Sequence, residues 1–132
     1  MMRGARAPMV DSVSRIPVRL VLEDRRHADA ELIRFQAPRT TDALLKRLPV
    51  EGRIARWKDE VYFEAGITMG PEKPKSKVET GTIAFWPMGS AICIFHGRTQ
   101  PYSPVNVVGV VRSGIEIFRD AAAGTKIRME RA

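Results

Sequence analysis

Short apolar segments of strand type, separated by turn residues, constrain the fold of this chain more than any other feature. Apolar residues alternate at Ile16, Val18, Leu20 and Leu22, which predicts a strand with one buried face. A polar turn follows and the chain then returns, so the domain is expected to open with a hairpin. The predicted strands cover residues 16–22, 30–35, 53–57, 61–65, 82–86, 91–95, 105–111 and 125–129.

Only two segments have helical character. Residues 40–42 supply N-cap side chains before the apolar residues 43–48, and Pro49 ends this short helix. A second helix is predicted over residues 115–123, with Gly124 as its C-cap. With many strands and few helices, a closed eight-stranded β-barrel with two short capping helices is more economical than a doubly wound sheet. The fold class is therefore mainly β.

Length and cysteine content limit the organisation further. The 132 residues suffice for one domain, which we expect over residues 15–132 behind a flexible N-terminal tail, residues 1–14. One cysteine excludes an internal disulfide framework, and one cysteine with two histidines cannot build a usual structural zinc site. We therefore expect no metal and no cofactor.

The sequence contains no targeting or membrane segment. No apolar region of signal-peptide length follows the arginines near the start, and the longest apolar runs fall far short of the ~18 residues that suggest a spanning helix. A lone thiol is compatible with a reducing compartment. The expected location is cytoplasmic, with no membrane partner.

The net charge of +7 raises nucleic acid as a partner, but the charge is dispersed. Residues 1–48, 49–98 and 99–132 carry +4, +1 and +2. The sequence shows no basic helix and no stripe of aromatic residues alternating with arginines, so no specific nucleic-acid binding is predicted. Lysines in the proline-rich loop 68–77 are interpreted as solvated.

Three segments of the sequence resemble a known family. The segment GTIAFWPMGSAICIFHG (residues 81–97) is followed by SPVNVVG (residues 103–109), and YFE (residues 62–64) fits the same pattern. Together they resemble the small prokaryotic cyclophilin-like proteins, a group of largely unknown function that is distantly similar to the cyclophilin peptidyl-prolyl isomerases. The resemblance covers roughly residues 15–132 and implies the same capped, eight-stranded barrel.

The resemblance also assigns positions to the isomerase site. Arg56 fits the register of the catalytic arginine of cyclophilins, with Glu64 in place of a glutamine eight positions on. Val61 replaces an aromatic residue of the proline pocket, and Asn106 stands where the site histidine would be. A guanidinium that donates to the prolyl nitrogen above an apolar floor lowers the rotation barrier of ~18–20 kcal/mol. Because most of that floor has changed, and because Glu64 can hold Arg56 in a salt bridge, weak or absent isomerase activity is predicted.

Aromatic residues on the predicted strands are candidates for a ligand pocket as well as for the core. Trp57, Tyr62, Phe85 and Trp86 are the aromatic candidates, with Arg56 and Glu64 as a polar rim.

Three polar residues have a structural and a functional interpretation. Cys93 and His96 are three positions apart and therefore point to opposite faces of a strand, so we expect a buried thiol rather than a nucleophile–base pair. His96, near a strand end, is either structural or a rim residue in contact with ligand. Asn106 lies inside an apolar strand, where its amide either clamps a neighbouring loop or recognises a ligand.

The sequence thus favours three candidate functions, in decreasing order of preference. The first is binding of a small molecule or a proline-containing peptide segment without efficient isomerase activity, with Tyr62, Glu64, Trp86, His96 and Asn106 as ligand contacts. The second is a divergent prolyl isomerase that uses Arg56. The third is a protein-interaction module, including a homodimer.

Overall fold

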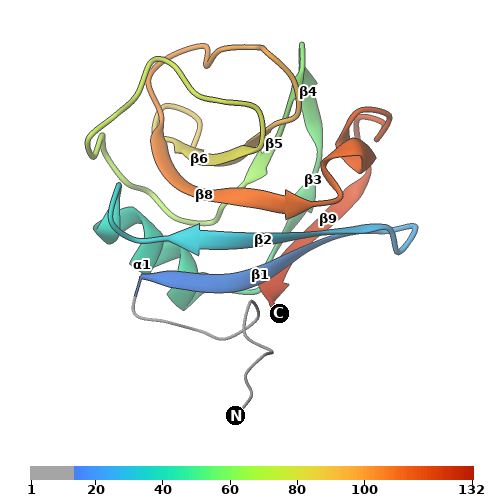
Figure 1. Cartoon of the computed structure of the whole chain (residues 1–132), viewed down its shortest axis with the longest axis horizontal. Coiled ribbons are helices and arrows are strands. Elements are labelled where there is room, and N and C mark those ends of the chain that lie inside the picture. Colours follow the sequence, from blue (N-terminus) through green and yellow to red (C-terminus); the bar gives the residue numbers. More distant parts are fainter. Residues whose placement is uncertain (1–13) are drawn as a thin grey trace.

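The computed structural model describes residues 14–132, which form one nine-stranded antiparallel sheet (Figure 1). Its strand order is β3-β9-β1-β2-β8-β6-β7-β5-β4. The strands are β1 (Arg15–Leu22), β2 (His27–Ile33), β3 (Val50–Arg53), β4 (Ala55–Trp57), β5 (Glu60–Glu64), β6 (Thr82–Trp86), β7 (Ala91–Phe95), β8 (Asn106–Ser113) and β9 (Lys126–Arg131).

The sheet curls into a barrel because its two edge strands are neighbours in sequence. β3 pairs with β9 and β4 pairs with β5, and only Ile54 separates β3 from β4. Ile54 interrupts the ladder by bonding outside it: its N–H donates to Thr125 O at 2.8 Å, and its carbonyl accepts from Gly124 N at 2.7 Å. β3 and β4 therefore act as one bent strand shared by both edges. The predicted mainly β barrel is confirmed, and the bend at Ile54 accounts for nine strands in place of eight.

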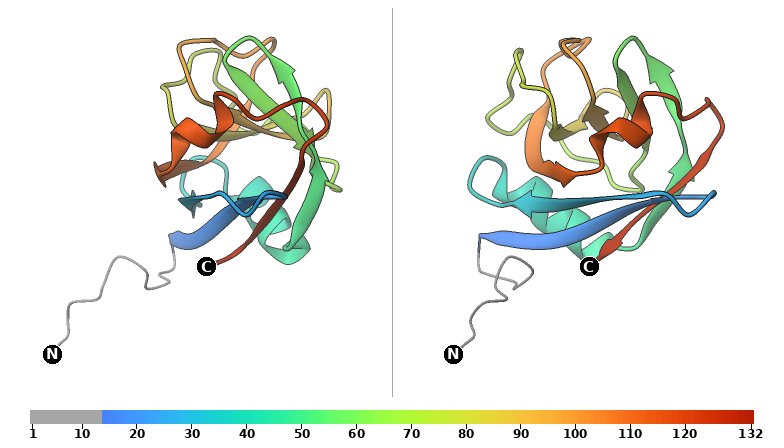
Figure 2. Two further views of the ribbon diagram at one scale, coloured as in Figure 1. Left: turned by 90° about the vertical axis from the view of Figure 1, so that its right-hand side faces the viewer. Right: turned by 45° about the vertical axis from the view of Figure 1, so that its right-hand side comes forward.

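Two helices lie at opposite ends of the barrel (Figures 1 and 2). The first, α1 (Pro38–Arg47), begins five residues before the predicted start at 43. Pro38 is suited to a first helical turn, since it lacks only an N–H that has no intrahelical partner there. The second predicted helix, residues 115–123, is only the 3-10 helix η2 (Ile115–Phe118), because the chain turns away after it.

The main core fills the barrel and follows the alternation of the strands. In β1 the side chains of Ile16, Val18, Leu20 and Leu22 are buried, as the sequence pattern predicts. Gly109 lets β8 approach β2 closely, because a Cβ at this position would collide with the carbonyl oxygen of Glu31. The last residue of the SPVNVVG motif is thus needed for strand packing.

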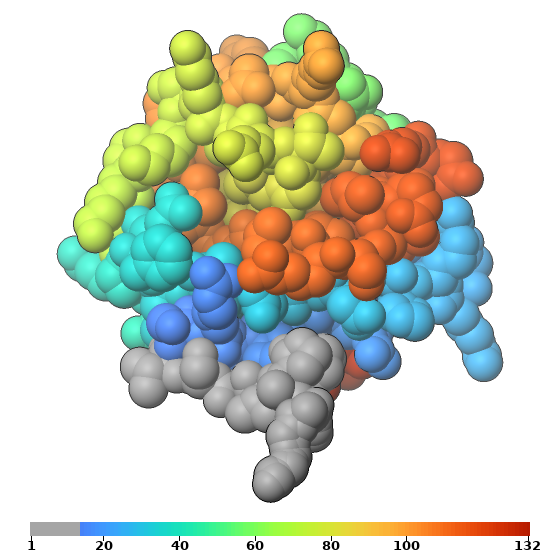
Figure 3. All heavy atoms as spheres, in the orientation of Figure 1, coloured from blue at the N-terminus to red at the C-terminus, as the bar shows by residue number. Residues whose placement is uncertain are grey.

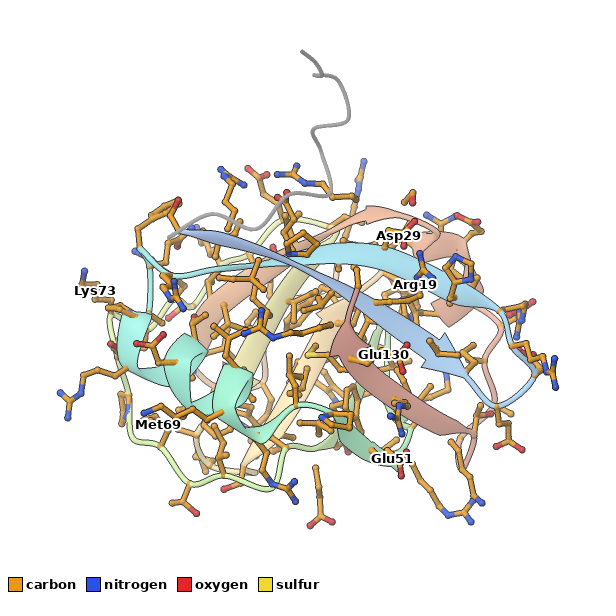
Figure 4. All side chains as sticks on the ribbon, turned by 90° about the horizontal axis from the view of Figure 1, so that it is seen from below. Arg19, Asp29, Glu51, Met69, Lys73 and Glu130 are labelled. Atoms are coloured by element: carbon orange, nitrogen blue, oxygen red, sulfur yellow. The ribbon has the colours of Figure 1, made fainter. Side chains whose placement is uncertain are left out.

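Charged side chains pair across the outer surface of the strands. Arg19 of β1 and Asp29 of β2 form an ion pair at 3.2 Å, and they face each other in Figure 4. Lys73 is exposed and projects beside α1 (Figure 4). Exposed pairs of this kind contribute little to stability, roughly 0–1 kcal/mol each. They agree with the dispersed distribution of charge along the sequence.

Within residues 14–132, no helix combines the length and the apolar character needed to cross a membrane. The predicted N-terminal tail, residues 1–14, falls outside the described residues except for Ser14.

Candidate functional site

A cleft of about 210 Å³ lies on the outer surface of the barrel, beside β4, β5 and β6. It is lined by aromatic rings and one carboxylate. The lining residues are Trp57, Glu60, Tyr62, Trp86, Pro101, Tyr102 and Val105. Apolar clefts with a few polar groups are the usual form of small-molecule sites, so this cleft is the candidate functional site.

Strand alternation places these side chains outside the barrel. In β5, Val61 and Phe63 belong to the main core, so Glu60 and Tyr62 point to the opposite face. In β7, Cys93 likewise points outward. It belongs to a second, smaller hydrophobic cluster, which shares Tyr62, Trp86 and Val105 with the lining of the cleft. This cluster comprises Ala84, Cys93, Phe95 and Val105, with Tyr62, Val78 and Trp86 packed against it.

The aromatic rings of the cleft stand nearly perpendicular to one another. The ring centroids of Trp57 and Tyr102 are 6.0 Å apart with planes at 90°. Trp86 makes similar contacts with Tyr102, at 6.2 Å and 79°, and with Tyr62, at 6.0 Å and 80°. Edge-to-face contacts of this kind orient the rings relative to one another. The cleft therefore has several differently directed aromatic walls.

Hydrogen bonds from the connecting loops hold the cleft in shape. Trp86 Nε1 donates to Ser103 Oγ at 2.6 Å, so the indole is tied to the segment that carries Tyr102. This segment, residues 96–105, is attached in turn to residues 65–81, and the two lie side by side on the surface in Figure 3. Val78 N donates to Gln100 Oε1 at 2.8 Å, and Thr80 Oγ1 donates to Gly97 O at 2.8 Å. These bonds fix the walls of the cleft relative to one another.

Glu60 is a buried carboxylate at the edge of this aromatic surface, with a fractional exposure of 6%. Burial raises the pKa of Glu60, and a hydrogen bond with Cys93 offsets part of that effect. Cys93 responds in the same sense: burial and the nearby Glu60 raise the pKa of its thiol well above the ordinary range. Within residues 14–132, no cationic side chain pairs with Glu60. A buried acid in a cleft without an ion-pair partner is a typical feature of functional sites.

Arg56 lies away from the cleft, and its guanidinium binds main-chain carbonyls near the end of η2. Nη1 donates to Phe118 O at 2.7 Å and to Ala121 O at 2.6 Å, and Nη2 donates to Arg119 O at 3.2 Å. These carbonyls follow a helical turn and have no helical partners of their own. Arg56 therefore stabilises this turn.

His96 lies next to Arg56 and is buried. Its Nε2 is 3.4 Å from Arg56 Nη2, and since arginine only donates, Nε2 acts as the acceptor and the proton resides on Nδ1. Burial and the charge of Arg56 lower the pKa of His96, so the imidazole is neutral at neutral pH. Arg56 and His96 border a shallow depression with Asp59 and Arg119, separate from the lining of the aromatic cleft.

The remaining residues suggested by the isomerase resemblance are not brought together. Glu64 is exposed at the far end of β5, and no ion pair joins it to Arg56 within the described chain. Val61 and Phe85 are completely buried in the main core, so neither lines a surface pocket. Of the predicted ligand contacts, Tyr62 and Trp86 line the cleft, and so does Trp57, which was predicted as an aromatic pocket candidate.

Asn106 is completely buried and clamps a loop. Its Oδ1 accepts from Glu72 N at 2.8 Å, and its Nδ2 donates to Gly70 O at 3.0 Å and Thr40 Oγ1 at 3.1 Å. The Glu72 carboxylate accepts in turn from the N–H groups of Arg39 and Thr40, at 3.0 and 2.8 Å, at the start of α1. All the amide hydrogens of Asn106 are thus used in joining residues 70–72 to α1.

Four lining residues of the cleft are absent from the predicted site: Glu60, Pro101, Tyr102 and Val105, the last of which was predicted only as part of a strand. A signal existed for Glu60, because it alternates with Tyr62 on β5 and must share its face. Because Glu60 lies beside a turn, its burial is not predicted from the sequence. No sequence signal identifies Pro101 and Tyr102, since they reach the cleft from a loop. No cluster of three or more metal-ligating side chains occurs within residues 14–132.

Comparisons with known proteins agree with the fold. The family described as "Cyclophilin-like" matches residues 16–130. A hypothetical protein from Archaeoglobus fulgidus, known from a solution structure, is similar with 32% identity and a TM-score of 0.78, over 94% of this chain and all of that one. The structure of McbB in complex with tryptophan is similar with 15% identity and a TM-score of 0.74, over 86% of this chain and 44% of that one. At this identity the similarity shows a shared fold alone. No curated protein matches the sequence.

Proposed function

The chain belongs to the cyclophilin-like family, and from this premise we propose that it binds a small molecule or a short peptide segment in the aromatic cleft, without efficient prolyl isomerase activity. The observation that carries the proposal is the cleft itself. Four aromatic side chains and a buried carboxylate meet there: Trp57, Tyr62, Trp86, Tyr102 and Glu60. Aromatic surface provides affinity, while a single polar group orients the ligand.

The surroundings of Arg56 argue against efficient isomerase chemistry. Catalysis requires a donor that is free to reach the prolyl nitrogen as the amide twists. Arg56 makes three hydrogen bonds to backbone carbonyls and a contact with His96, which together occupy both of its terminal nitrogens. A substrate would have to displace these partners, and Val61 is inside the barrel rather than beneath a proline.

The chain carries a built-in probe for the binding proposal. Its two tryptophans, Trp57 and Trp86, both line the cleft, so intrinsic fluorescence reports on this site. Titration with a panel of small molecules and proline-containing peptides is expected to change the emission with at least one compound. Tyr102→Ala should weaken that binding, whereas Lys46→Ala, an exposed substitution on α1, serves as the matched control. Binding that is insensitive to Tyr102→Ala would place the ligand elsewhere and contradict the proposal.

Isomerase activity is tested separately with a proline-peptide assay. The rate with the protein is expected to equal the uncatalysed rate within error. Turnover at the level of a cyclophilin, abolished by Arg56→Ala in a folded variant, would establish the opposite conclusion.

A further inference from the structure

We infer that the ligand of the aromatic cleft carries a small organic cation, a methylated ammonium group, held between the rings of Trp57, Trp86 and Tyr102 and the carboxylate of Glu60. This inference rests on the proposed binding function and specifies the ligand class. It follows from the arrangement of the rings, the isolation of the carboxylate and the size of the cleft.

The ring geometry fits a shared cation. The negative face of an aromatic ring attracts a cation within about 6 Å of its centroid, and tryptophan does so best. Trp57, Trp86 and Tyr102 all line the cleft. The centroids of Trp57 and Tyr102 are 6.0 Å apart and those of Trp86 and Tyr102 are 6.2 Å apart, so a small cation in the cleft lies within reach of more than one ring.

Trp57 already attracts a cation of the chain itself. Lys58 Nζ lies 4.8 Å from the ring centroid of Trp57. Lys58 is exposed and is absent from the lining of the cleft, so it leaves the cleft accessible. The contact shows that this indole is positioned to bind positive charge.

The carboxylate of Glu60 determines the sign of the ligand's charge. Glu60 is buried at the cleft wall and has Cys93 as its only hydrogen-bonding side chain among the described residues. A neutral ligand without a hydrogen-bond donor would cover the carboxylate and strip it of water without providing a partner, and an anion would add repulsion. A cation instead supplies the missing charge in a site of low dielectric. A methylated ammonium also has an apolar surface that suits the aromatic walls.

The size of the cleft limits the ligand to a small group. Pockets for drug-sized molecules have volumes of about 300–1,000 Å³. The cleft, at about 210 Å³, is smaller and fits a compact head group rather than an extended molecule.

The experiment compares choline with its neutral isostere, dimethylbutanol, in which carbon replaces the ammonium nitrogen. Tryptophan fluorescence is measured during titration of the full-length protein with each probe, with sodium chloride matched to choline chloride to cancel ionic strength. We expect choline to bind about tenfold more tightly than dimethylbutanol, or better, because only choline gains from the rings and the carboxylate as a cation.

Three variants separate the contributions of the carboxylate and of the ring. Glu60→Gln keeps the size of the side chain and removes its charge, so choline affinity should fall about tenfold while dimethylbutanol affinity is unchanged. Tyr102→Leu should weaken choline binding, and Tyr102→Phe, which keeps the ring, should restore it. Tyr102 is 71% exposed, so neither substitution threatens folding. An acetylated trimethyl-lysine amide, measured in parallel, tells whether a peptide-borne ammonium enters as well as a free one.

The possible failures are distinguishable. Equal affinity for choline and dimethylbutanol, or choline binding that Glu60→Gln leaves intact, overturns the inference and leaves the proposed function standing. Absence of binding by both probes also overturns the inference. The proposed function itself falls only if the wider panel of small molecules and peptides fails too.

Discussion

The fold shifts the pKa values of two carboxyl groups near the loops of the barrel, Glu72 and Glu60, in opposite directions. Burial alone would raise the pKa of Glu72, but hydrogen bonds from Thr40 and Arg39 outweigh it and hold the pKa below its ordinary value. Glu60 lies beside the aromatic rings of the cleft, and burial raises its pKa, since among the described residues only the Cys93 thiol bonds to its carboxyl group. The two groups have the same chemistry and differ in their burial, since Glu60 is buried and Glu72 is half-buried, and in the donors that reach them.

We infer from this difference that the surroundings of Glu72 stabilise the fold, whereas those of Glu60 serve ligand binding. The donors around Glu72 come from α1, and together with Asn106 they close a network in which each polar group has a partner. Arg56 belongs to the same category, because its hydrogen bonds end on backbone carbonyls. Within residues 14–132, only the Glu60 region retains a buried acidic group without a partner of opposite sign. Substitutions in the closed networks should therefore change stability, and those in the cleft should change binding.

The largest effect is expected for Asn106→Ala, which breaks the network of Glu72. Gly70 O, Glu72 N and Thr40 Oγ1 each lose a partner, so the free energy of unfolding should fall by about 3 kcal/mol. Urea unfolding of the variant measures the change. Val107→Ala, at a half-buried neighbour outside the network, is the control and should cost less. A stability equal to that of the wild type would show that the network is not structural.

A smaller loss is expected for Arg56→Met, which removes the guanidinium but keeps much of the aliphatic side chain. The carbonyls of Phe118, Arg119 and Ala121 lose their donor, and the partly exposed site lets water replace some of it. The free energy of unfolding should fall by about 2 kcal/mol. Ligand affinity in the cleft should not change, since Arg56 does not line it. A loss of affinity without a loss of stability would reverse the assignment of the two regions.

Glu60→Gln tests the opposite side of the comparison. Removing a buried charge that has no cationic partner should leave stability at pH 7 unchanged or raise it by up to about 1 kcal/mol. The affinity for choline should fall about tenfold at the same time. Chemical unfolding and choline titration of the same preparation give both quantities. A marked destabilisation would place Glu60 with Glu72 among the structural groups.

The sequence predicts the barrel well because the barrel depends on local patterns. Alternation in β1 identified its buried face, and the SPVNVVG motif contains Gly109, which the β2–β8 contact requires. The predicted start of α1 is wrong because the carboxylate that stabilises its first turn, Glu72, lies more than thirty residues away in sequence and reaches the helix only in the folded protein. Patterns of neighbouring residues cannot reveal such long-range contacts.

The candidate site is less predictable for the same reason. Tyr62 and Trp86 lie on strands, where aromatic residues are prominent, and both were identified as candidates. Tyr102 enters the cleft from a loop held by hydrogen bonds to another loop, so its position depends on the whole fold. Resemblance directed attention to Arg56, and only the geometry shows its guanidinium bound to carbonyls near η2.

The smallest effect, and the most specific one, is the pH dependence of the Glu60→Gln stability difference. The pKa of Glu60 is raised in the folded protein from its ordinary value of 4.5, so the folded state holds this proton more tightly than the unfolded state. In acid, where both states are protonated, wild type and variant should be equally stable. As the pH rises through 4.5 the unfolded Glu60 ionises first, and wild type loses stability relative to the variant until the pH passes the raised pKa of the folded protein.

The other titratable groups do not obscure this difference. The lowered pKa values of Glu72 and His96 make both proteins less stable in acid, and this shared effect cancels in the difference. Cys93, the titratable group in contact with Glu60, stays protonated throughout because its own pKa is raised. Urea unfolding of both proteins between about pH 4 and pH 8 measures the difference. A difference that shrinks with rising pH would mean that the carboxylate is stabilised as an anion, and Glu60 would then resemble Glu72.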